Sequence, residues 1–270
     1  MKTDLTPDQI ARYRERGYVV IDGFLSKEEL ELWRRQIDEA VAARQDRKLA
    51  NRDWRAGDAY YDKVFTQRIN LWMDHEGVRR LMLDRRIGKM AAGLAGVDGI
   101  RIWHDQALIK EPWANPTGWH LDNPYWSFSS RHAISLWVAL DDVTRDNGCL
   151  YFLPGTHRTA TWENGPINEN IAALFELYPA WAGLEADAAP MEAGSCSFHN
   201  GLLAHGAGAN MTPGRRRAMT CGFMPDGCTF NGQANVLPPE YLATLSEGDV
   251  LDDDEQNPLL YHVGGGGVGA

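Results

Sequence analysis

The stretch SLWVALDDVTRDNGCLYFLPGTH, residues 135–157, decides the fold. It starts within the run Ala133–Leu140, which is apolar at both odd and even positions, as a strand covered on both faces should be. The pair Asn147-Gly148 then signals a turn, and a second apolar run follows at Cys149–Leu153. The two runs predict short, buried strands.

Similar short runs lie on both sides of this stretch, separated by Gly, Pro and Asn signals. They are Ile100–Ile109, Ser195–His199 and Ala218–Met224. Runs of this length and spacing are typical of a sandwich, a jelly roll or a barrel. Before Gly99 the pattern is helical instead, with start signals at Thr6-Pro7 and at the capping box Ser26–Glu29, and again over residues 75–94. We therefore expect a mainly β fold with flanking helices.

The charge of the chain is concentrated near its end. The formal net charge is −10, from 27 basic and 37 acidic side chains. Residues 218–270 contain eight acidic residues and no Lys or Arg, so they carry −8 of this charge. An acidic balance without a basic stripe argues against a nucleic-acid partner, because neutralisation of phosphates dominates that kind of binding. We interpret the acidic run as a solvated tail.

The sequence also carries predictions about location. The first residues lack an apolar signal region, and no stretch approaches the roughly 18 apolar residues of a membrane-spanning helix. The four cysteines show no CxxC pattern or regular spacing, which is typical of buried thiols in a reducing compartment. We therefore expect a cytoplasmic protein with no membrane partner, whose oligomeric state the sequence does not indicate.

A pair of potential metal ligands occurs at His120-Leu121-Asp122. In a strand, residues two apart project from the same face, so the imidazole and the carboxylate can converge on one ion. A structural hydrogen bond between the two side chains is the simpler alternative. A second histidine, His205, would complete the two-His, one-carboxylate set of non-haem Fe(II) oxygenases, which leaves positions open for a co-substrate and O2.

Arg216 lies eleven residues after His205, beyond a stretch rich in Gly, Asn and Pro. A planar guanidinium grips a carboxylate with two hydrogen bonds, as an oxygenase that uses 2-oxoglutarate requires for the distant end of that co-substrate. We expect a hairpin to return Arg216 to the strand neighbouring that of His205. Strand alternation should then turn Arg215 and Arg217 to the opposite face.

His199 competes with His205 for the role of second imidazole ligand. It ends a predicted strand at an Asn-Gly turn signal and would then act behind the metal ligands or only in the structure. His205 is followed by small residues that leave room for a metal, and Arg216 follows at a suitable distance. We choose His205.

Three segments together resemble the phytanoyl-CoA dioxygenase family: Trp119-His120-Leu121-Asp122, the opening stretch Ser135–His157, and HGAGANMTPGRRRA at His205–Ala218. The stretch GYVVIDGFLS, Gly17–Ser26, is similar to the start of that family, so the resemblance covers roughly residues 10–225. It implies an Fe(II)/2-oxoglutarate oxygenase built on a double-stranded β-helix, a cupin-like jelly roll.

The resemblance implies one oxygenase domain over residues 1–270. It would consist of a helical part (1–98), a jelly-roll core (99–225) with a helical insertion near 167–178, and an acidic C-terminal extension (226–270). The implied metal ligands are His120, Asp122 and His205. Arg216 would hold the far carboxylate of 2-oxoglutarate, and Trp137 would line the co-substrate pocket. Because Asp122 is a carboxylate, the resemblance implies hydroxylation rather than halogenation.

One departure from the family concerns Ala207, where many members have a serine that bonds the co-substrate. Another donor must then serve, and Gln106 and Lys110 are candidates because they share a parity on the strand before the metal loop. We assign Gln106 to the co-substrate and Lys110 to the substrate; for each, a solvated rim residue is the alternative.

Other side chains near these motifs receive weaker assignments. Trp126 and Tyr125 are predicted to form a substrate wall, with simple packing as the alternative. Tyr60 and Tyr61 with Arg55 are interpreted as an ordinary polar loop rather than a lid. Three further histidines are predicted to be structural: His104, His132 and His157.

The predicted function is hydroxylation of a C–H bond in a small organic substrate, with Fe(II), 2-oxoglutarate and O2. Two alternatives stay open. One is a different mononuclear metal enzyme on a cupin-type barrel that does not use 2-oxoglutarate. The other is a non-catalytic small-molecule binding module, although such a module would have no need to keep metal ligands. The sequence does not identify the substrate.

Overall fold

The computed structural model describes residues 1–50 and 60–265, so Arg55 lies outside the described residues. The strands are β1 (Tyr18–Ile21), β2 (Thr66–Ile69), β3 (Gly99–Lys110), β4 (Thr117–His120), β5 (Ile134–Ala139), β6 (Leu150–Phe152), β7 (Asp187–Ala189), β8 (Cys196–Asn200), β9 (His205–Ala207), β10 (Arg216–Pro225) and β11 (Leu259–His262). The α-helices are α1 (Pro7–Arg16), α2 (Lys27–Arg44), α3 (Leu71–Asp74), α4 (Glu76–Met82), α5 (Arg85–Ala95), α6 (Leu174–Leu177) and α7 (Pro239–Leu242). The 3₁₀ turns are η1 (Tyr61–Lys63), η2 (Asn123–Tyr125), η3 (Thr156–Arg158) and η4 (Pro179–Trp181).

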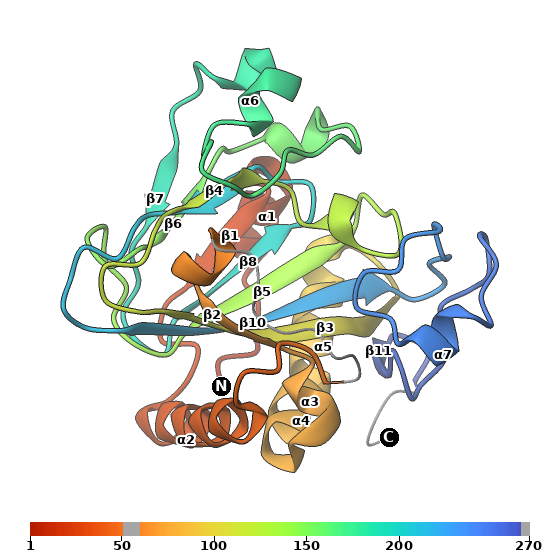
Figure 1. Cartoon of the computed structure of the whole chain (residues 1–270). Helices are drawn as coiled ribbons and strands as arrows, with labels where there is room; N and C mark the ends of the chain where they lie inside the picture. Colours follow the sequence, from red (N-terminus) through yellow and green to blue (C-terminus); the bar gives the residue numbers. More distant parts are fainter. Residues whose placement is uncertain (51–59, 266–270) are drawn as a thin grey trace.

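The strands form two antiparallel sheets. The larger has the order β1-β8-β5-β10-β3-β11, with β2 also paired to β3, and the smaller has the order β4-β9-β6-β7. Figure 1 shows the smaller sheet above one face of the larger sheet and helices α2 to α5 below the other face. The prediction of a mainly β jelly roll with flanking helices is confirmed.

Strand β10 shows how the alternation of side chains divides the large sheet into two faces. Met219, Cys221 and Phe223 point to the helices and are buried in a core with residues of α2 to α5. Thr220 and Gly222, between them in sequence, line a cavity on the opposite face. The outer face therefore stabilises the fold, while the inner face is available for a site.

The N-terminal helices begin where the sequence predicts. Ser26 caps α2 in a capping box with Glu29, and Gly17 ends α1 in a left-handed conformation with φ of 84°. The helical pattern of residues 75–94 belongs to two helices, because the Asp84 side chain accepts a hydrogen bond from the Arg86 N–H and begins α5.

Two later segments differ from expectation to different degrees. The insertion near 167–178 contains one short helix, α6, which follows bends and turns, so it is less helical than expected. The acidic segment is no solvated tail over its described residues, since β11 joins the large sheet and Val236, Leu251 and Leu260 are buried. Its charge is partly compensated by a distant partner, because Arg101 pairs with Asp226 at 2.6 Å and with Asp254 at 2.7 Å.

None of the helices in the described part of the chain has the length and hydropathy needed to span a bilayer.

Candidate active site

The His-Asp-His cluster predicted from the sequence comes together between β4 and β9. The two strands pair with His120 opposite His205, which brings the two imidazole rings to a centroid separation of 4.2 Å. Asp122 Oδ1 lies 3.5 Å from the Nε2 atoms of both histidines. One ligand atom from each residue lies within 4.8 Å of the others, so a single ion can contact all three.

Asp122 reaches this position by a route that differs from the expected one. We expected His120 and Asp122 to lie two apart in a strand, but β4 ends at His120. Asp122 has helical backbone angles, φ −77° and ψ −52°, and precedes the turn η2. The turn, rather than strand alternation, directs the carboxylate back towards the histidines.

Backbone carbonyls fix the orientation of both imidazoles. Nδ1 of His120 lies 2.9 Å from the Gly118 carbonyl oxygen, and Nδ1 of His205 lies 2.9 Å from that of Leu203. A carbonyl only accepts, so each Nδ1 carries the proton and each Nε2 keeps a lone pair that faces Asp122. Burial and the neighbouring His120 lower the pKa of His205 well below its ordinary value, which favours the neutral form that binds a metal.

The second oxygen of Asp122 is held by two donors from the large sheet. Oδ2 accepts a hydrogen bond of 2.7 Å from Ser135 Oγ and one of 3.1 Å from His199 Nε2. Burial alone would raise the pKa of Asp122, but the neighbouring His205 and the hydrogen bond from His199 keep it well below its ordinary value. The carboxylate is therefore ionised and offers Oδ1 to the centre of the cluster. His199 lies behind this carboxylate.

The cluster opens into a cavity of about 550 Å³ between the two sheets. Trp137, Trp126, Tyr125, Gln106 and Arg216 line it, and all five belong to the predicted co-substrate or substrate sites. Ala207 also lines it and supplies no side-chain donor. The structure thus brings most of the predicted site residues to one space.

Arg216 is buried in this cavity wall with unused hydrogen-bonding capacity. Its side chain is 1% exposed and its Cζ atom lies 5.2 Å from the centroid of the Trp137 ring. Within residues 1–50 and 60–265, its Nε and Nη1 atoms have no hydrogen-bond partner. Burial lowers the pKa of Arg216 to about 10, so the group remains a cation at neutral pH. A buried cation with free N–H groups fits an incoming carboxylate.

The expected hairpin between His205 and Arg216 is wrong. β9 belongs to the small sheet and β10 to the large one, so the intervening Gly-rich segment crosses from one sheet to the other. Arg216 therefore approaches the cavity from the wall opposite His205. The predicted alternation does hold, since Arg217 turns away to pair with Asp141 at 2.6 Å and with Asp38 at 2.7 Å.

Lys110 does not belong to the cavity lining, contrary to its assignment as a substrate residue. Its Nζ atom donates a hydrogen bond of 2.6 Å to the Asn115 carbonyl and lies 4.6 Å from the centre of the Phe65 ring. It shares the parity of Gln106 as expected, but it sits at the end of β3, where packing encloses the side chain completely. Burial and the charge of Arg216 lower the pKa of Lys110 to about 6.

Several cavity residues were missed by sequence reasoning. His104 was expected to be structural but lines the cavity, and its parity with Gln106 on β3 was the available signal. Tyr61 was expected in an ordinary polar loop but also lines it. Gln67, Asn235 and Val236 carried no signal, because they come from segments without a motif.

The imidazoles of the remaining predicted structural histidines lie against backbone carbonyls. His132 Nδ1 lies 2.9 Å from the Ala95 carbonyl oxygen, and His157 Nε2 lies 3.4 Å from that of Arg14. Neither lines the cavity.

The comparisons with known proteins agree with this geometry. The family model described as phytanoyl-CoA dioxygenase (PhyH) matches residues 13–218. The chain belongs to the phytanoyl-CoA dioxygenase family. The match includes all three residues of the cluster as well as Arg216 and Trp137.

Relatives within and around the family are moderately similar to this chain. The peroxisomal phytanoyl-CoA dioxygenase of Mus musculus is 27% identical over 245 residues, which covers 83% of this chain and 70% of the mouse protein. The structure of SnoK, a non-haem α-ketoglutarate-dependent carbocyclase of nogalamycin biosynthesis, superposes with a TM-score of 0.78 at 28% identity and covers 95% of this chain and 96% of SnoK. The epimerase SnoN, in complex with Fe³⁺, α-ketoglutarate and nogalamycin RO, gives 0.76 at 27% identity, with 94% and 97% covered.

Proposed function

We propose that this protein is an Fe(II)- and 2-oxoglutarate-dependent dioxygenase that hydroxylates a C–H bond of a small organic substrate. The reaction consumes O2 and releases succinate and CO2. The observation that carries the proposal is the presence, in one cavity, of the His-Asp-His cluster and of the buried Arg216, whose Nε and Nη1 atoms have no partner among the described residues. The cluster alone would fit several metals, and the arginine favours a co-substrate with a carboxylate.

Three side chains would hold the iron: His120 and His205 through Nε2, and Asp122 through Oδ1. Two neutral imidazoles and one carboxylate on one face of the ion leave other positions open. When bound, the iron supplies the activation of O2, coupled to oxidation of 2-oxoglutarate. Ser135 and His199 keep Asp122 Oδ2 engaged, so that only Oδ1 remains for the metal.

Arg216 would bind the far carboxylate of 2-oxoglutarate, and Trp137 supports its guanidinium from one side. Gln106 was expected to bind the co-substrate in place of the missing serine at position 207. Its amide contacts Gln67 and His104, and these contacts involve neither Arg216 nor Trp137. The apolar walls exclude water from the reacting groups, which protects the reaction and strengthens the electrostatic contacts inside.

The fold and the cysteines support two further parts of the proposal, the single domain and the cellular compartment. The packing of α2 to α5 on the large sheet, and the pairing of β11 with β3, support one oxygenase domain over residues 1–270. All four cysteines are free, which supports a reducing compartment such as the cytoplasm.

The proposal is tested by the metal content and the reaction products of purified protein. The wild type should bind one Fe(II) and form succinate from 2-oxoglutarate only when Fe(II) is present. His120→Ala should lose its iron, measured by elemental analysis, because two ligands seldom retain a labile ion. His132→Ala, a histidine outside the cavity, is the matched control and should retain it. Stoichiometric iron in His120→Ala would contradict the assignment.

A further inference from the structure

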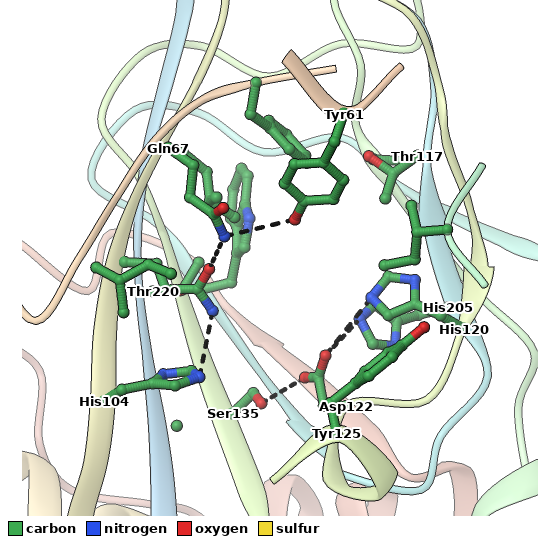
Figure 2. Close-up of a pocket in the computed structure, with 18 of the residues that line it drawn as sticks. Tyr61, Gln67, His104, Thr117, His120, Asp122, Tyr125, Ser135, His205 and Thr220 are labelled. Atoms are coloured by element: carbon green, nitrogen blue, oxygen red, sulfur yellow. Dashed lines mark hydrogen bonds and ion pairs between the residues drawn. The ribbon is translucent and has the colours of Figure 1, made fainter. Parts of the chain in front are cut away.

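The cavity has two opposing walls of different chemistry. Figure 2 shows His120, Asp122 and His205 on one side and Gln67 and His104 on the other, across open space. The first wall is the metal cluster. The second wall faces the cluster from the other side of the cavity.

A row of neutral hydrogen-bonding groups runs along the second wall (Figure 2). The Gln67 amide N–H donates to Gln106 Oε1, and Gln67 Nε2 also lies 3.4 Å from Tyr61 Oη. The Gln106 Nε2 atom then lies 3.5 Å from His104 Nε2. The row is built from the pairing of β2 with β3, which places Gln67 opposite Leu108, two residues from Gln106.

This row retains donors for a further partner. An amide nitrogen carries two hydrogens, and in the described ranges His104 is the one partner of Gln106 Nε2. Thr220 lies opposite Gln106 in the β3–β10 register and also lines the cavity. An amide N–H and a hydroxyl can both donate to a hydroxyl, carbonyl or ether oxygen.

The lining offers little to a charged molecule once the metal cluster and Arg216 are set aside. Among the lining residues of the described ranges, Lys48 is then the one Lys or Arg and no Asp or Glu remains. Lys48 Nζ already pairs with Asp62 Oδ1 at 2.8 Å. Burial lowers the pKa of His104 to about 4, so the row stays neutral at physiological pH. A charged substrate would lose its hydration without gaining a counter-ion, which is strongly unfavourable.

The rest of the cavity surface is apolar and suits a ligand with an apolar ring system. Its apolar lining residues include Phe65, Ile69, Leu108, Trp126, Ile167 and Val236. Trp126 packs edge-to-face on His104 at 5.6 Å, and Gly222 leaves room for both, since a Cβ there would lie 3.0 Å from the indole. The whole cavity, which the co-substrate would share, has a volume of about 550 Å³, within the range of ligand pockets.

We propose that this wall selects an uncharged substrate with an apolar, ring-sized body, and that Gln106 and Thr220 bind a hydroxyl or carbonyl oxygen on it. The inference rests on the proposed function, because the opposite wall must carry the metal centre. It assigns Gln106 to substrate binding instead of co-substrate binding.

The test uses the full chain loaded with Zn(II) and 2-oxoglutarate, which occupy the metal centre and Arg216 without turnover. Three probes share one ring system and differ in charge: 2-naphthol, 2-naphthoate and 2-naphthylmethylammonium. Isothermal titration calorimetry should show that 2-naphthol binds about tenfold or more tightly than either ion. Equal or tighter binding of an ion, or no binding of 2-naphthol, would overturn the proposal.

A pair of variants tests the recognition of the oxygen. Gln106→Leu should weaken 2-naphthol about 3- to 10-fold, as expected for the loss of one neutral hydrogen bond. Gln233→Leu makes the same exchange at an exposed residue outside the lining and should leave the affinity unchanged. Equal effects of the two variants would contradict the role of Gln106. Binding of 2-oxoglutarate alone, measured first, separates the two proposals: its absence defeats the proposed function, whereas its presence without probe selectivity defeats only this inference.

Discussion

The two faces of the large sheet carry adjacent arginines, one with carboxylate partners and one without. On the outer face, Arg217 has two carboxylate partners, Asp38 and Asp141, at 2.7 and 2.6 Å. On the inner face, Arg216 is almost fully buried, and in the described ranges two of its nitrogens have no hydrogen-bond partner. A buried cation without a partner is unfavourable for folding. The difference indicates that the outer face is arranged for stability and the inner face for a ligand.

The largest expected effect is the loss of 2-oxoglutarate affinity when Arg216, but not Arg217, is replaced. Arg216→Ala should weaken 2-oxoglutarate binding by about 2–4 kcal/mol, roughly 30- to 800-fold, because charged hydrogen bonds to its carboxylate are lost. It should not lower the free energy of unfolding, since the native state loses an unpartnered charge. Titration calorimetry on the Zn(II)-loaded protein and urea unfolding measure the two quantities.

Arg217→Ala is the matched control and should lower stability without weakening 2-oxoglutarate binding. Loss of its pairs with Asp38 and Asp141 should lower the free energy of unfolding by about 1–3 kcal/mol, while 2-oxoglutarate affinity stays within about twofold. If both variants lost affinity equally, the contrast between the two faces would not hold. An unchanged affinity in Arg216→Ala would favour a metal enzyme that does not use 2-oxoglutarate.

Ser135 provides a second, smaller test of the inner face. Its hydroxyl donates to Asp122 Oδ2 at 2.7 Å, and groups that orient a metal ligand in this way typically contribute about 10-fold or more to metal affinity. Ser135→Ala should therefore weaken Co(II) binding about 10-fold, as followed by the visible spectrum of the bound ion.

Ser197→Ala is the control for Ser135→Ala. Ser197 is also a buried serine of the large sheet, in the strand next to β5, but its hydroxyl has no partner in the part of the chain that the structure describes. Its replacement should leave Co(II) affinity unchanged. A similar loss in both variants would indicate a general packing effect instead of orientation of Asp122.

The metal cluster was predictable because its signals are local. His120 and Asp122 are two residues apart, and His205 and Arg216 flank one Gly-rich segment. The wall opposite depends on pairings between segments far apart in sequence. Gln67 reaches the cavity only because β2 pairs with β3 in one register, and no short motif encodes that register.

Two errors show where charge and parity mislead. Lys110 has the correct parity, but the cavity ends before it, and this limit is set by the packing of Asn115 and Phe65 around it. The acidic segment looked solvated from its charge alone. Its apolar residues Val236 and Leu251 are buried, and Arg101, more than 100 residues earlier, supplies part of the compensating charge.

The smallest expected effect concerns the pH dependence of the outer face. Burial would raise the pKa of Asp141, but hydrogen bonds from Arg217 lower it below its ordinary value. A depressed pKa in the folded state gives stability that is present above the unfolded pKa, about 3.9, and is lost as the pH falls through the folded value. Asp141→Asn should therefore cost about 1 kcal/mol of unfolding free energy at pH 7 and progressively less below pH 4. Urea unfolding of wild type and variant at pH 7 and pH 3 measures this difference.

Asp146→Asn is the control, at an exposed residue without an ion pair in the described ranges. Its difference from wild type in unfolding free energy should be the same at pH 7 and pH 3. For Asp141→Asn, a gap that stayed constant with pH would contradict a stabilising contribution from the ionised form of Asp141.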